Sequence, residues 1–62
     1  MMTKLEIYRC ARNNLLFIQH QQATELKELD RYAPEELRQK VEETYQKILW
    51  ITQEIEKLQG AM

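Results

Sequence analysis

The sequence has no serine and only one cysteine, one histidine, one proline and one glycine. Cys10 and His20 are ten residues apart, so a nucleophile, a base and an orienting group cannot be assembled within one chain. No pair of His or Cys residues has the spacing of metal ligands. We therefore expect that the protein is not an enzyme and holds no cofactor and no metal ion.

Long apolar runs and an excess of one charge are also missing. Residues 15–18 and 48–51 form apolar runs of only four residues, whereas a membrane span needs about 20. Nine Lys and Arg stand against ten Asp and Glu, so no net charge attracts nucleic acid or anionic lipid. The N-terminus lacks the apolar stretch of a signal peptide, and a lone cysteine fits a reducing compartment. These absences predict a cytoplasmic protein with no membrane partner and no small-molecule substrate.

The chain does contain two long helical patterns with a short connection between them. Thr3 and Glu6 have the spacing of a capping box, and Pro34 suits the first position of a helix. The sequence predicts one domain over residues 1–62, with a helix at about 3–30, a turn at 31–33 and a helix at about 34–59. The expected hairpin core, read from the apolar periodicity, consists of Tyr8, Ala11, Leu15, Ile18, Leu26, Leu29, Leu37, Val41, Ile48, Ile51, Ile55 and Leu58, with Gln22 and Thr44 in the same rows.

A short connection makes the helices antiparallel neighbours, so the predicted fold is an all-α two-helix hairpin. Folding back near residue 33 places residues 15–18 beside residues 48–51. In each of these blocks, two bulky side chains fall outside the seam between the helices. A chain of this length buries little apolar surface alone, so we expect two hairpins to form a four-helix bundle. The expected dimer or partner interface is a belt of Leu16, Phe17, Leu49 and Trp50.

A row of Asn13, Phe17 and Gln21 lies on the back of the first predicted helix. This row, within NNLLFIQHQQATELKEL, resembles the Rop family of plasmid copy-number regulators, and the likeness extends without a gap over nearly the whole chain. The resemblance implies a helical hairpin that dimerises into an antiparallel four-helix bundle and binds paired RNA stem-loops across its first helices. The sequence departs from that pattern where Glu6 and Glu28 replace lysines of the RNA-contacting face.

Two functions follow from these patterns. The first is a non-catalytic regulatory or adaptor protein that acts as a homodimer and binds another protein, as the uncovered belt and the near-neutral charge favour. The alternative is a Rop-like RNA-binding regulator. Phosphate neutralisation supplies much of RNA affinity, so the two glutamates predict weak RNA binding or none. The candidate RNA face consists of Arg9, Arg12, Asn13, Phe17, His20, Gln21 and Lys27.

Overall fold

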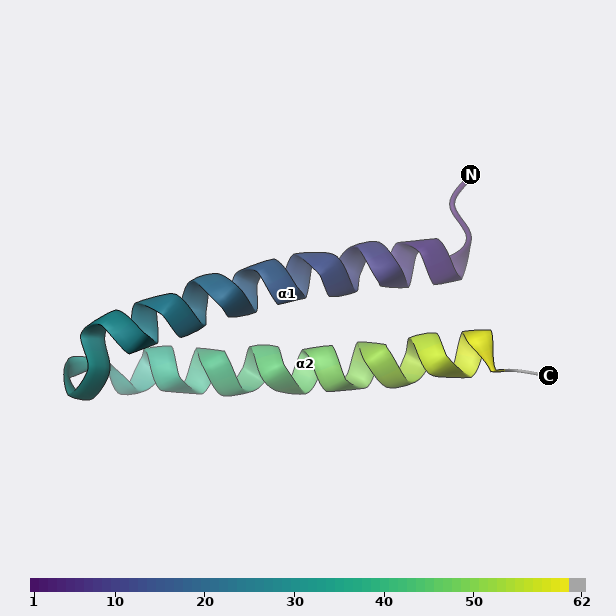
Figure 1. Cartoon of the computed structure of the whole chain (residues 1–62). Helices are drawn as coiled ribbons and strands as arrows, with labels where there is room; N and C mark the ends of the chain where they lie inside the picture. The colour runs from purple at the N-terminus through teal and green to yellow at the C-terminus, as the bar shows by residue number, and fades with distance from the viewer. Residues whose placement is uncertain (61–62) are drawn as a thin grey trace.

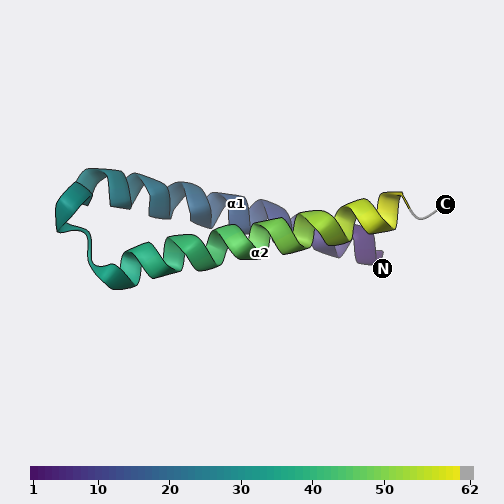
Figure 2. The ribbon, with the colours of Figure 1, turned by 90° about the horizontal axis from the view of Figure 1, so that it is seen from below.

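The computed structural model describes residues 1–60 and contains two helices joined by a tight turn (Figure 1). Helix α1 spans Lys4–Leu29, a 3₁₀ turn η1 spans Asp30–Tyr32, and helix α2 spans Glu35–Gln59. The helices run antiparallel and side by side, and a second view shows that they cross rather than lie strictly parallel (Figure 2). The predicted all-α antiparallel hairpin is therefore confirmed.

The helix ends follow local capping chemistry. The Thr3 hydroxyl accepts a hydrogen bond from the Glu6 amide at 3.2 Å, and the Glu6 carboxylate accepts one from the Thr3 amide at 3.4 Å. This is the predicted capping box, which satisfies amide groups that the first turn of a helix leaves unpaired. Pro34 differs from its prediction by one position, because it is the N-cap of α2, with an extended ψ of 149°. Its carbonyl accepts from the Leu37 amide at 3.1 Å, a role that requires no amide of its own.

The buried core lies mainly on α2. Leu37, Ile51 and Ile55 expose 8%, 4% and 2% of their surface, and Thr44 exposes 6%. These four side chains follow the predicted heptad row. The other expected core residues that are partly buried are Tyr8, Ala11, Leu15, Leu26, Val41 and Ile48.

Three residues expected in the core are exposed in the single hairpin. Ile18 exposes 40% of its surface, and Leu29 and Leu58 each expose 37%. On α1, Arg12 and Gln19 are partly buried instead. For Ile18 and Leu29, the physical reason is that the apolar stripe of α1 is wider than the strip that one facing helix covers. Helix α1 is thus turned about its axis relative to the prediction, and part of its stripe faces solvent.

Within residues 1–60, neither helix is long and apolar enough to cross a membrane.

Candidate partner-binding surfaces

The large side chains near the middle of the hairpin point to three different surfaces. Successive residues of a helix are turned by about 100°, so a residue next to a seam position points sideways and the following one points backwards. Because the two helices are antiparallel, the same rotation leads to the same side of the hairpin on both. One side therefore carries Leu16 and Leu49, which we call the Leu16 side. The opposite side carries Ile18, which we call the Ile18 side.

The four belt residues do not form one continuous surface. Leu16 and Leu49 expose 43% and 40% of their surface on the same side, whereas Phe17, at 62%, points to the back of α1. Trp50 is 54% exposed, but its ring lies 6.1 Å from the Tyr8 ring, tilted by 52°. This aromatic contact holds Trp50 against the hairpin. A single flat interface cannot cover all four side chains.

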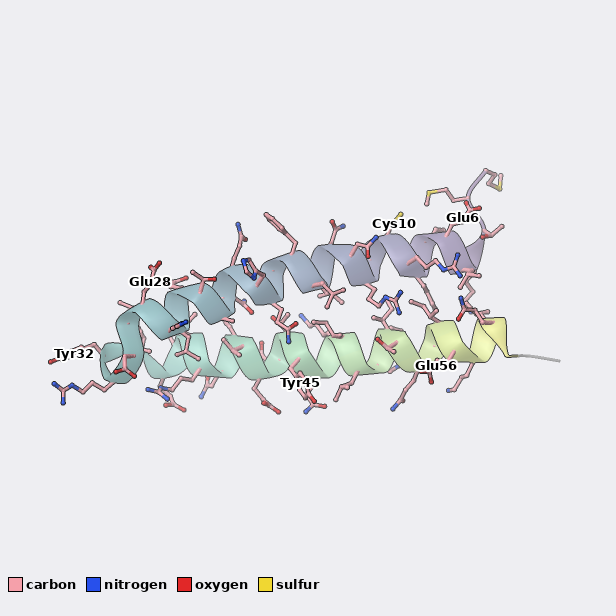
Figure 3. The ribbon with its side chains drawn as sticks, in the orientation of Figure 1. Glu6, Cys10, Glu28, Tyr32, Tyr45 and Glu56 are labelled. Atoms are coloured by element: carbon pink, nitrogen blue, oxygen red, sulfur yellow. The ribbon has the colours of Figure 1, made fainter. Side chains whose placement is uncertain are left out.

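The Leu16 side has an apolar middle with basic residues around it. Leu16 lies at the middle of α1, and Leu49 lies within one turn of the middle of α2. Tyr45, one turn before Leu49, is 46% exposed and adds to the apolar centre (Figure 3). At helical spacings of three, four or seven residues, the same side also carries Arg9, Arg12, His20 and Lys27 on α1, and Arg38 and Glu56 on α2.

Sequence reasoning missed Tyr45 and Arg38 as members of this surface. Tyr45 and Arg38 precede Leu49 by four and eleven residues, so helical periodicity places them on the same side as Leu49. This signal was present in the sequence. Arg38 also contacts the turn, because its Nη2 donates a hydrogen bond to the Asp30 carbonyl at 3.3 Å.

The Ile18 side has a hollow near the turn. The hollow has a volume of about 310 Å³ and is lined by Gln22, Glu25, Pro34, Glu36, Leu37 and Lys40. Ile18 lies one turn before Gln22 and two turns before Glu25, so it shares this side. The Gln22 side-chain oxygen is buried without a hydrogen-bond partner among the described residues. An acceptor left in this state costs about 1–3 kcal/mol.

Exposed apolar side chains recur along the Ile18 side of α1 at intervals of about three turns. Ile7 is 51% exposed, and Ile7, Ile18 and Leu29 are separated by eleven residues each, close to three full turns. On α2, Leu58 follows Lys40 by eighteen residues, or five full turns, and so lies on the same side.

The back of α1, opposite α2, forms an outer ridge with Phe17 at its centre. Asn13 and Gln21 flank Phe17 at one turn in either direction. Glu6, Cys10 and Glu28 point away from α2 on the same helix (Figure 3). The structure thus divides the candidate RNA face. The ridge holds the amides, Phe17 and two carboxylates, while Arg9, His20 and Lys27 lie at its edge with the Leu16 side, and Arg12 is partly buried.

In the part of the chain that the structure describes, no group of three His, Cys, Asp or Glu residues could hold a metal ion. Cys10 is a free, exposed thiol.

Comparisons with known proteins add no identification. No family model matches the sequence, and neither a curated protein nor a solved structure matches it. The fold agrees with the hairpin that the resemblance to Rop implies, at the level of two packed antiparallel helices.

Proposed function

We propose that the chain is a non-catalytic adaptor or regulatory protein of the cytoplasm, which acts as a homodimeric helical bundle. Its partner is an acidic, amphipathic segment of another protein, bound on the Leu16 side. One observation carries this proposal. Three large apolar side chains, Leu16, Tyr45 and Leu49, are 40–46% exposed at the middle of a rigid surface that also carries Arg and Lys.

The chemistry of such a surface suits a helical ligand. An amphipathic helix binds by laying its apolar face on exposed apolar side chains at i, i+3, i+4 and i+7. Carboxylates on its flanks would pair with the Arg9, Lys27 and Arg38 cations, and such charge-assisted contacts fix orientation and register. Glu56 lies at the edge of the same side, so an acidic ligand would be favoured toward the turn, where Lys27 and Arg38 stand.

Dimerisation is supported by the small core of one hairpin. Only three apolar side chains within residues 1–60 are buried, and chains of this size often need oligomerisation to become stable. A second hairpin that covers one side would leave the other side free for a ligand.

The test is a binding titration with two designed peptides. Both have leucines at i, i+3, i+4 and i+7, and they differ only in carrying Glu or Lys at the flanking positions. We expect the acidic peptide to bind more tightly, and its affinity to fall with salt because the cations on the protein are exposed. Leu16→Ala combined with Leu49→Ala should weaken binding at least tenfold, while Phe17→Ala, on the outer ridge, serves as the matched control. Equal binding of both peptides, or no effect of the double substitution, would overturn the proposal.

A second candidate is the Rop-like RNA-binding function. Arg9, His20 and Lys27 line up along α1 at spacings of eleven and seven residues, which favours contact with a phosphate backbone. Glu6 and Glu28 on the neighbouring ridge oppose it. In a mobility-shift assay on kissing stem-loops we expect weak binding or none. Tight, salt-sensitive binding that Arg9→Ala abolishes would make this function the better one.

A further inference from the structure

Both helices build the wall of the hollow near the turn. Helix α1 contributes Gln22 and Glu25, which are one turn apart, and helix α2 contributes Glu36, Leu37 and Lys40. The hollow has a volume of about 310 Å³, whereas about 10–15 Å³ of such space holds one water molecule. It is therefore large enough for an organic group.

The wall of the hollow carries an excess of negative charge. Two carboxylates, Glu25 and Glu36, stand against one ammonium group, Lys40, which gives a formal charge of −1. The one ion pair found within residues 1–60 joins Lys57 to Glu54, so none of the three groups is paired. The two carboxylates come from opposite helices, and their oxygens are free to accept hydrogen bonds from a cation. An anion would be repelled by both.

Gln22 supplies a third acceptor at the same place. Its side-chain oxygen is buried and has no hydrogen-bond partner within residues 1–60, and the residue lines the hollow. The last torsion of a Gln side chain is broad, so rotation of the amide group alone brings this oxygen to a donor placed in the hollow. Three acceptor groups thus surround the hollow, and a fitting ligand supplies N–H donors.

The rest of the wall is apolar. Leu37 is 8% exposed and Pro34 adds its ring, so an alkyl stem can pack there. An ammonium group is compact and strongly hydrated, whereas a guanidinium group is planar, more weakly hydrated and carries five N–H donors in a fixed fork. Acceptors on two helices beside an apolar wall therefore favour guanidinium over ammonium.

We propose that the hollow binds an alkylguanidinium group. The guanidinium donates to the carboxylates of Glu25 and Glu36 and to the Gln22 oxygen, and its alkyl stem packs on Leu37. The arginine side chain of a partner protein and a free guanidinium compound share this chemistry. The site lies on the Ile18 side, so it is distinct from the ligand surface on the Leu16 side.

The test is a titration of the ¹⁵N-labelled protein with n-butylguanidinium, followed by NMR. We expect saturable shifts in the Gln22 side-chain amide and in backbone amides around the hollow. n-Butylammonium has the same stem and charge, and should bind more weakly. Equal binding of the two cations, or shifts that spread over all the carboxylates of the chain, would overturn the site.

Glu36→Gln and Glu25→Gln should each lower the affinity for n-butylguanidinium about two- to fivefold, as is usual for an exposed ion pair. Glu35→Gln is the matched control for the first, because Glu35 lies in the same first turn of α2 but does not line the hollow. Glu28→Gln is the control for the second, because Glu28 points away from α2 (Figure 3). A control that weakens binding as much as its partner variant would show attraction by overall charge and would overturn the site.

A second titration separates the two sources of the group. Arginine blocked at both its amino and carboxyl ends represents the side chain of a protein. Tighter binding of blocked arginine than of n-butylguanidinium assigns the site to a partner protein, and the reverse order assigns it to a free compound. Leu16→Ala combined with Leu49→Ala should leave both affinities unchanged. Failure of the site therefore leaves the proposed function intact, and failure of peptide binding on the Leu16 side leaves the site intact.

Discussion

Ile55 is only 2% exposed, whereas Phe17 is 62% exposed. We expect Ile55→Ala to lower the free energy of unfolding by about 2–5 kcal/mol, because it leaves a cavity between the helices. Phe17→Ala should change it by no more than about 0.5 kcal/mol, as is usual for an exposed side chain. Urea unfolding of both variants at one protein concentration gives the comparison. A loss for Phe17→Ala as large as that for Ile55→Ala would show that the outer ridge is packed in the assembly.

Helix α1 shows where residue type alone gives a wrong prediction of the buried face. The apolar pattern assigned Ile18 to the core, yet Arg12 and Gln19 are the partly buried neighbours in the single hairpin. Long polar side chains can lay their apolar stems along a seam while the polar head reaches water. A rule that assigns every Arg and Gln to the exterior therefore displaces the predicted buried face of α1 by about one residue.

The belt residues illustrate a second limit. Leu16, Phe17, Leu49 and Trp50 were predicted as a dimer or partner interface because they share a height along the hairpin and fall outside its seam. Rotation of about 100° per residue sends them to different surfaces, a fact available from the sequence. The contact between Trp50 and Tyr8 at 6.1 Å was not available, because it depends on how the two side chains fold across the seam.

At the scale of single elements, the start of α1 depends on its capping box. Thr3→Ala removes the hydroxyl that accepts from the Glu6 amide at 3.2 Å, and we expect a loss of about 1 kcal/mol in unfolding free energy. Thr3→Ser keeps the acceptor and should keep most of the stability. Thermal unfolding followed by circular dichroism measures both, and equal stability of the Ala and Ser variants would contradict the role of the cap.

The turn offers a substitution expected to stabilise. Asp30 has φ 51° and ψ −125°, a conformation that costs a residue other than glycine about 1–3 kcal/mol. Asp30→Gly removes this strain, but the greater conformational freedom of glycine in the unfolded chain offsets about 0.5–1 kcal/mol of the stabilisation. Asp30→Gly should therefore raise the free energy of unfolding by about 1 kcal/mol. Asp30→Val should lower it, because a β-branched side chain is strained there. The prediction fails if the valine variant is the more stable of the two in urea unfolding.

The two helices were predictable to different degrees. The heptad row of α2 predicted its buried residues Leu37, Ile51 and Ile55 because one facing helix covers a row of that width. Pro34 shifted by one position because proline, which has no amide hydrogen, satisfies both the N-cap and the first helical position. The local sequence does not distinguish these two placements.

At the scale of the whole molecule, the central claim is that the hairpin works as a homodimer. Light scattering coupled to size exclusion, over a range of micromolar concentrations, measures the mass most directly. We expect a mass twice the 7.6 kDa of one chain, together with a melting temperature that rises with protein concentration. A folded monomer of 7.6 kDa, with a melting temperature independent of concentration, would contradict it.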